Sequence, residues 1–172
     1  MTVTLRELDG NGQDIDAVQQ VLDGAPRYTL RVTGRPVRSA DAEALVVALP
    51  LGLVRSAKHV FAVDLDGTMV GVVDLLDGWP DPSTAPLGLL LLDETHQHHG
   101  IGGLVWQQLQ TMLALRSHVR TVRAAVVHTN VQVLPFWTRC GFTDTGQRKP
   151  YTSDELVSTA IILERPVQAG TT

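Results

Sequence analysis

The sequence predicts an α/β fold built on a single mixed β-sheet, and three features of the chain predict it. The apolar run Leu87–Leu92 is typical of a buried strand, and it leads through a glycine-rich turn into an apolar helix. The Asp66-Gly67 pair between two apolar segments is typical of a tight antiparallel hairpin. Helical and extended patterns alternate along the chain, so parallel and antiparallel strands are expected in one sheet.

The expected elements follow in the order β-α-α-β-β-β-α-β-α-β-β. Apolar residues three to four apart predict helices at 14–22, capped by Asp14, and at 41–49. The segment 25–40 between them is rich in Arg, Pro and Gly and shows no clear pattern. The strands are expected at 2–6, 59–64, 69–76, 87–92, 121–128, 142–147 and 155–163, and the later helices at 102–116 and 131–140.

Composition limits the class of protein. A chain of 172 residues with 44% hydrophobic residues suits one domain, expected at 1–165 with a C-terminal tail at 166–172. The net charge of −4 and the two lysines argue against a nucleic-acid partner. No apolar stretch approaches the roughly 20 residues of a membrane span. With one cysteine, Cys140, and no pattern of a secretory signal, we expect a cytoplasmic protein.

The turn after Leu92 is the strongest functional signal. Gly100, Gly102 and Gly103 leave main-chain N–H groups uncovered where a helix begins, and such a helix start attracts anions. A phosphate-bearing ligand is therefore expected. The spacing fits neither the G-x-G-x-x-G dinucleotide fingerprint nor the G-x-x-x-x-G-K-[ST] loop of nucleotide triphosphatases.

Two motifs resemble those of the GNAT superfamily of N-acetyltransferases. Gln97-x-x-Gly100-x-Gly102 resembles its Q/R-x-x-G-x-G/A pyrophosphate loop. About 30 residues later, the segment from Asn130 to Phe142 resembles its N-x-x-A-x-x-F-Y-x-x-x-G-F pattern. The order of elements resembles that family along the whole chain. The resemblance implies the GNAT fold and transfer of an acetyl group from acetyl-CoA to an amine.

The resemblance also assigns roles in binding coenzyme A. Main-chain groups of Leu90 and Leu92 would pair with the pantetheine arm like an added strand, and the Leu92 amide would polarise the thioester carbonyl. Asn130 would hydrogen-bond the pantetheine, and Gln97 would fix the turn. The expected cofactor-binding residues are Leu90, Leu91, Leu92, Gln97, His98, His99, Gly100, Ile101, Gly102, Gly103, Asn130, Val133, Phe136 and Trp137.

The proton chemistry departs from the family pattern, because Trp137 stands where many members have the tyrosine that protonates the departing thiolate. An indole N–H is not an acid near neutral pH. Tyr151 is the candidate replacement, and the alternative is a tyrosine that only caps the sheet. Asp74, the single charge in 69–76, is the candidate that attracts the acceptor ammonium or takes its proton.

An acceptor site is expected around Asp74, Trp79, Asp81 and Tyr28, where an aromatic ring and carboxylates would suit a cationic amine. The alternative for the loop acids is plain solvation. Tyr28, Arg31 and Arg35 could contact an acidic group on the acceptor, but a surface position is expected for them. His96, His98 and His99 lie close together, but a tight turn rarely provides tetrahedral geometry, so no metal is expected.

Three functions remain open at this point. The first is acetyl transfer to a small-molecule amine in a direct ternary complex. The second is acetylation of a protein or peptide. The third, from another class, is a non-catalytic acyl-CoA-binding or regulatory module. A homodimer is also possible, through pairing of the edge strands expected at 142–147 and 155–163.

Overall fold

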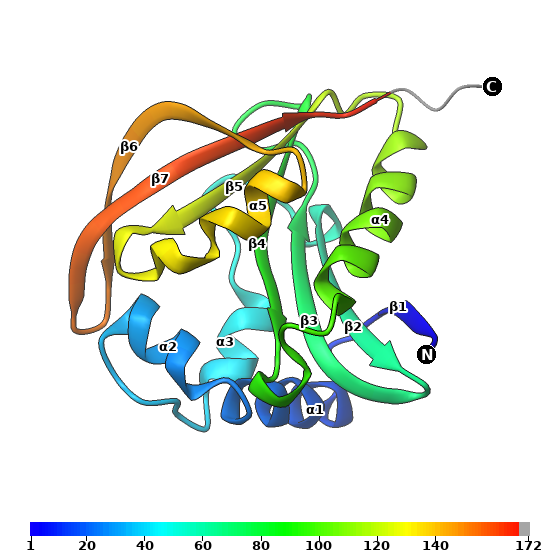
Figure 1. Cartoon of the computed structure of the whole chain (residues 1–172), viewed down its shortest axis with the longest axis vertical. Coiled ribbons are helices and arrows are strands. Elements are labelled where there is room, and N and C mark those ends of the chain that lie inside the picture. Colours follow the sequence, from blue (N-terminus) through cyan, green and yellow to red (C-terminus); the bar gives the residue numbers. More distant parts are fainter. Residues whose placement is uncertain (169–172) are drawn as a thin grey trace.

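Seven strands form one mixed sheet in the computed structural model, which describes residues 1–168 (Figure 1). The strands lie in the order β1-β2-β3-β4-β5-β7-β6. Their bounds are β1 Val3–Glu7, β2 Lys58–Leu65, β3 Thr68–Leu76, β4 Thr84–Leu92, β5 Thr121–Val127, β6 Thr143–Ser153 and β7 Leu156–Pro166. Among these seven strands, only β4 and β5 pair in parallel. The predicted α/β class with a mixed sheet is confirmed.

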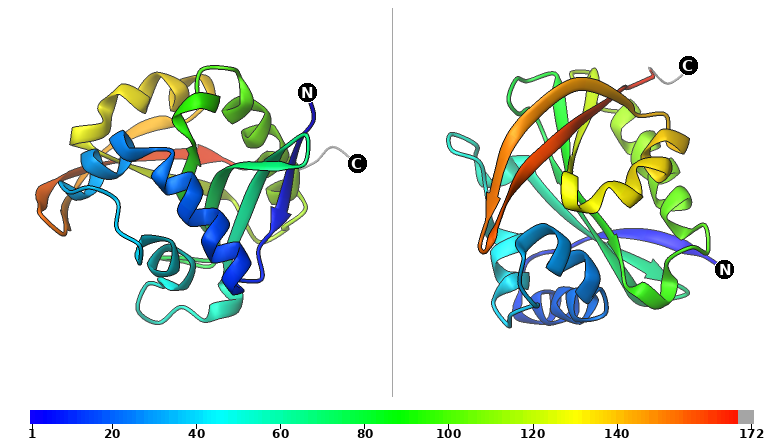
Figure 2. Two further views of the ribbon diagram at one scale, coloured as in Figure 1. Left: turned by 90° about the horizontal axis from the view of Figure 1, so that it is seen from below. Right: turned by 60° about the vertical axis from the view of Figure 1, so that its left-hand side comes forward.

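Helices cover both faces of the sheet (Figure 2). Their bounds are α1 Gly12–Asp23, α2 Pro26–Thr33, α3 Asp41–Val47, α4 Ile101–Ala114 and α5 Leu134–Arg139. Apolar residues of α1 and α3 form a core on one face with β2, β3 and β4. Those of α4 and α5 form a second core on the other face. The alternation of side chains along β2, β3 and β4 supplies residues to both cores.

Helix α2 is the element that the sequence pattern did not predict. Pro26 stands in its first turn, where its fixed φ favours a helix, and Gly34 ends it in the left-handed conformation. Thr29 is its only buried residue, so the helix has no apolar stripe to recognise. Polar contacts at both of its ends hold it instead.

Several element boundaries also differ from the prediction. Asn11, not Asp14, caps α1, and the Asp14 carboxylate accepts from the N–H groups of Asp9 and Gly10. β4 begins at Thr84 because pairing with β5, not the apolar run, fixes its start. α5 begins only at Leu134, after a 3-10 helix.

The C-terminal hairpin is longer than predicted. β6 continues to Ser153 through Pro150, which an edge strand tolerates because a missing N–H there breaks no ladder bond. β7 lies between β5 and β6, so it is not an edge strand, and of this hairpin only β6 has a free edge. β7 extends to Pro166, one residue into the expected tail, and residues 169–172 of that tail lie outside the described part.

The central feature of the sheet is that β4 and β5 pair over only half of their lengths. Their register runs from Thr84 opposite Thr121 to Leu87 opposite Ala124, whereas β4 continues to Leu92. Beyond this point the two strands separate, and we call the gap between residues 88–92 and 125–127 the splay. None of the helices within residues 1–168 is long and apolar enough to cross a bilayer.

A close backbone approach at Gly71 holds the carboxyl end of β4 against β3. A Cβ at this position would lie 2.5 Å from both the Leu91 carbonyl oxygen and the Leu92 side chain. We therefore expect Gly71→Ala to lower the free energy of unfolding by about 1 to 3 kcal/mol, through overpacking. Gly12→Ala, where a Cβ meets nothing within 4 Å, is the matched control. Urea unfolding checks both, and equal stabilities would contradict the close approach.

Candidate active site

The main-chain groups of Leu90 and Leu92 point into the splay. Asp93 N–H donates to the Val70 carbonyl of β3, and Asp93 is opposite Val70 in the antiparallel register. Because main-chain groups alternate sides along a strand, Leu91 also bonds toward β3, and Leu90 and Leu92 face the other way. There β5 has already separated, so the main-chain groups of Leu90 and the N–H of Leu92 have no strand partner and could pair with an extended ligand.

The chain after β4 makes a tightly fastened turn. The Asp93 carboxylate accepts from the N–H of His96 at 3.0 Å and from the Thr95 hydroxyl at 2.7 Å. The Gln97 amide donates to the Leu92 carbonyl at 2.8 Å, which fits its predicted role of fixing the turn. His98 has φ of +64°, a left-handed conformation that is uncommon for a residue other than glycine. This backbone reverses the chain just before α4.

The turn presents a row of free donors. Among residues 1–168, the main-chain N–H groups of residues 98–102 have no hydrogen-bond acceptor. No side chain caps α4, and its 14 residues align their peptide dipoles toward this point. A Cβ added at Gly100 or Gly103 would meet nothing within 4 Å, so the approach is open. The donors fit a pyrophosphate.

The second motif meets the first at Gly102. A Cβ on Gly102 would lie 3.1 Å from the ring of Phe136 in α5, so only glycine lets the start of α4 come so close to this ring. Phe136 and Val133 are half-buried at the margin of the core. Asn130, in the 3-10 helix His128–Val133, is buried and accepts from the Gln132 amide at 2.6 Å. The two motifs thus border the same end of the splay.

Trp137, predicted to border the cofactor, lies in the core between the sheet and α5. Its ring packs edge-on against Phe136 and Phe142, with centroids 5.1 and 5.0 Å apart, and it is 8% exposed. Its position therefore gives it a packing role in this core. Cys140 is also buried in this core, and burial raises the pKa of its thiol.

A buried ion pair lies on the opposite face of the sheet. Lys58 of β2 and Asp74 of β3 share the face of Val60 and Val72, which pack against α1 and α3. The Lys58 ammonium contacts both Asp74 oxygens, at 2.9 and 2.8 Å. Burial raises the pKa of Asp74, and the Lys58 charge opposes this shift. The sequence signal for Lys58 was a lone lysine in phase with an apolar strand face.

Tyr28 and Tyr151 lie near this pair. Burial raises the pKa of Tyr28, and the nearby Tyr151 and Asp74 side chains raise it further, so the three side chains lie in one neighbourhood. The Tyr151 hydroxyl donates to the Val32 carbonyl at 2.7 Å. The structure thus brings two of the predicted acceptor-site residues, Asp74 and Tyr28, together with the candidate acid Tyr151. As an acid, Tyr151 would first have to release Val32.

Trp79 and Asp81 do not join this neighbourhood. Asp81 accepts from the hydroxyls of Ser83 and Thr84 at 2.7 and 2.8 Å, so it closes its own turn. The loop precedes β4, whereas the free amides follow β4, so the two lie at opposite ends of the strand. We therefore remove both residues from the candidate acceptor site.

Helix α2 bridges the splay on the face of the sheet that carries Lys58 and Asp74. Its first turn is fastened to the end of β4, because Arg27 donates to Glu94 at 2.8 Å. Its carboxyl end is fastened to the other side of the gap, where the Arg31 carbonyl accepts from Thr129. The Val32 carbonyl accepts from Tyr151 of β6, as described. We call residues 26–35 the α2 bridge.

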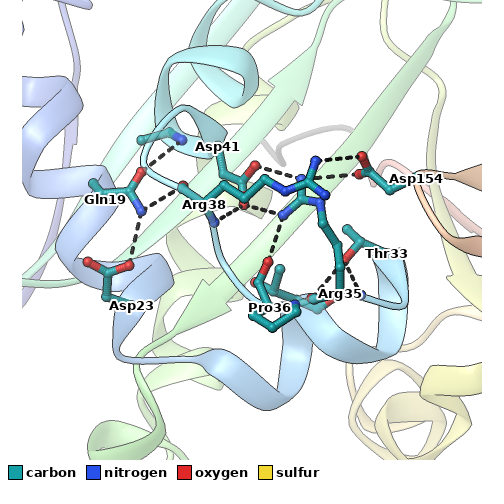
Figure 3. A network of polar contacts seen from close by, with 10 residues as sticks. Gln19, Asp23, Thr33, Arg35, Pro36, Arg38, Asp41 and Asp154 are labelled. Atoms are coloured by element: carbon teal, nitrogen blue, oxygen red, sulfur yellow. Dashed lines mark hydrogen bonds and ion pairs between the residues drawn. The ribbon is translucent and has the colours of Figure 1, made fainter.

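The Arg35 guanidinium fastens the end of the bridge (Figure 3). It makes a two-pronged contact with Asp41 of α3, at 2.8 and 2.7 Å, and reaches Asp154 at the tip of the β6–β7 hairpin at 3.1 Å. The Glu155 N–H donates to the Thr33 carbonyl at 3.1 Å beside it. The prediction of a surface position for Arg35 was wrong, since it is 7% exposed. Of its two carboxylate partners, Asp41 is six residues away and Asp154 is distant in sequence.

The histidines of the turn have separate environments. His96 contacts Asp93 at 2.7 Å, whereas His98 and His99 are exposed beside the free amides. Among the described residues, no group of three or more His, Cys, Asp or Glu side chains is arranged to hold a metal ion.

Comparisons with known proteins identify the family of this chain. Residues 28–142 match the acetyltransferase (GNAT) family, and the chain belongs to that family. It is a GNAT-family N-acetyltransferase with a mixed α/β fold. No curated protein sequence matches it.

Solved structures show the same fold over nearly the whole chain. An acetyltransferase from Thermus thermophilus has a TM-score of 0.73 and 22% identity, covering 96% of this chain and 97% of its own. A spermidine N-acetyltransferase from Vibrio cholerae in complex with CoA and spermine has 0.72 and 17%, covering 97% and 96%. The ribosomal-protein-S18-alanine N-acetyltransferase from Escherichia coli has 0.68 and 17%, covering 99% and 97%.

The Arg35 contact gives a pH-dependent prediction. The guanidinium lowers the pKa of Asp41 below its ordinary value near 4, so the contact stabilises the fold above that pH and is lost as the pH falls further. We expect Asp41→Asn to lower the melting temperature by several degrees at pH 7. The difference from the wild type should shrink steadily below pH 4. Calorimetry across pH checks this, and a constant difference would contradict it.

Proposed function

We propose that the protein transfers an acetyl group from acetyl-CoA to a primary amine of a small molecule, in a direct ternary complex. The free amides of residues 98–102 carry the proposal for coenzyme A, because they offer aligned donors to a pyrophosphate beside an open strand edge. Leu90, Leu92 and Asn130 would hold the pantetheine arm, with the Leu92 amide facing the thioester carbonyl. Bound there, acetyl-CoA would supply an activated acetyl group.

The α2 bridge supports a small acceptor over a polypeptide. Tyr151, Asp154 and Glu155 of the hairpin all contact residues 32–35, so the space between α2 and the β6–β7 hairpin is closed by polar contacts. An extended peptide would have to break these contacts to lie there. A small amine needs only the opening at the splay, where Gly88 and Ala125 are exposed in the middle of the sheet.

Direct transfer is supported by the position of the only cysteine. Cys140 lies in the α4 and α5 core, on the face opposite Asp74, and burial raises the pKa of its thiol. It is therefore poorly placed to carry an acyl group. In the proposed reaction Asp74 receives the acceptor ammonium, whose nitrogen attacks the acetyl carbon once a proton has left. The C–N bond forms, the C–S bond breaks, and the thiolate takes up the second proton from nitrogen.

Thiol release from acetyl-CoA tests this function. Small amines, amino acids and polyamines would be compared with short peptides that have free N-termini. We expect thiol release with at least one small amine and a kcat/KM at least about tenfold lower for every peptide. A preference for peptides would favour protein acetylation. Tight CoA binding without thiol release for any amine would favour a non-catalytic module.

Asp74→Asn and Tyr151→Phe separate the two proposed proton carriers. If Asp74 receives the amine, Asp74→Asn should lower kcat/KM by about 10²-fold or more. If Tyr151 acts through its bond to Val32, Tyr151→Phe should raise the acceptor KM several-fold and change kcat little. A fall in kcat of about 10²-fold in Tyr151→Phe would instead assign the thiolate's acid to Tyr151. Unchanged kcat and kcat/KM in both variants would contradict both roles.

A further inference from the structure

Lys58 is a buried charge in a chain that has only one other lysine. Its side chain is 1% exposed, and its ammonium contacts both oxygens of Asp74. A buried ammonium is costly unless it is paired. Even a paired one often stabilises the fold no more than apolar residues of similar volume would. The position therefore calls for an explanation other than stability.

Asp74 lies where β4 and β5 begin to separate. Gly88 is the first residue of β4 after the last pair with β5, and it is exposed. A Cβ on Gly88 would lie 3.2 Å from the Asp74 Oδ2 atom. Because Gly88 has no side chain, the Asp74 carboxylate can be reached from the splay. An amine that binds Asp74 from the splay would share this carboxylate with the Lys58 ammonium.

We propose that Lys58 lowers the pKa of the acceptor's ammonium group when it is bound at Asp74, and so increases the fraction of the nucleophilic free amine. The proposal deepens the proposed function and rests on it. Two like charges within about 4 to 6 Å disfavour the charged form of the more acidic group, and burial strengthens the effect. Lys58 is then a positioning residue: it fixes the carboxylate and sets the charge that the incoming amine meets.

The other charged and titratable groups around the pair do not replace Lys58. Arg55 lies near enough to lower the pKa of Asp74, but its side chain is exposed and it donates to the Lys58 carbonyl. Tyr28 of α2 stays neutral near pH 7, because burial raises its pKa. Tyr151 of β6 directs its hydroxyl to Val32. Among the described residues around Asp74, Lys58 is the cation whose side chain is fully buried.

The proton balance defines the measurement. The bound ammonium gives one proton to water through Asp74, and its nitrogen then attacks, with the second proton passing to the thiolate. One proton is released per acetyl transferred. The pH profile of kcat reports the bound amine, whereas that of kcat/KM for the acceptor reports the free amine and the free enzyme. The effect of Lys58 on the bound amine should therefore appear in the kcat profile.

The test measures both profiles with two acceptors of similar shape but different amine pKa. In the wild type, the rising limb of kcat should lie about 1 pH unit below the pKa of each free amine, and that of kcat/KM at that pKa. Lys58→Gln and Lys58→Met should move the kcat limb up by about 1 unit. Lys58→Arg keeps the charge and should not move it. Lys149→Gln, which changes the other, exposed lysine, is the matched control.

Several outcomes decide the matter. A kcat limb that does not move in Lys58→Gln or Lys58→Met, although the variant binds CoA like the wild type, would overturn the proposal. A limb that moves but does not follow the amine pKa of the acceptor would also overturn it, since Asp74 would then be titrating. If neither variant binds CoA, the wild-type profile decides. A rising limb of kcat at or above the pKa of the free amine would then overturn the proposal. Failure of wild-type thiol release with every amine overturns the function as well.

Discussion

The early end of the β4–β5 pairing is the constraint on which the rest of the site depends. A parallel pair in the centre of a sheet normally satisfies the main-chain groups of both strands. Here the register stops at Leu87, and the groups of Leu90 and Leu92 remain without a strand partner. The turn at residues 93–100 then places free amides at the open end of the same gap. One interruption in the sheet thus creates both a strand edge and an anion site.

The two faces of the sheet differ in their chemistry at the splay, because different helices cover them. On one side, Gly102 lets α4 approach Phe136, so the two GNAT motifs meet beside the free amides. On the other side, the α2 bridge crosses the gap and is fastened to β4, the 3-10 helix and the β6–β7 hairpin. The buried Lys58–Asp74 pair lies on that side. The family match and this division support a donor on one side and an amine on the other.

Sequence patterns predicted the parts of the fold that follow from apolar periodicity and from local turns. The strand Leu87–Leu92, the hairpin at Asp66-Gly67 and the helix after the glycine turn are of this kind. The α2 bridge was missed because it buries no apolar stripe. Arg35 and Lys58 were missed because a charged residue is normally exposed, and their carboxylate partners are fixed only by the tertiary fold.

Hydrogen exchange of the β4 amides, followed residue by residue by NMR, tests the account of the splay most directly. The N–H groups of Leu89 and Leu91 bond to β3, so they should exchange slowly with and without CoA. Those of Leu90 and Leu92 should exchange rapidly in the free protein and become protected when CoA binds. Equal protection of all four amides in the free protein would show that the gap is closed. Protection of neither Leu90 nor Leu92 by CoA would contradict the proposed binding of its pantetheine arm.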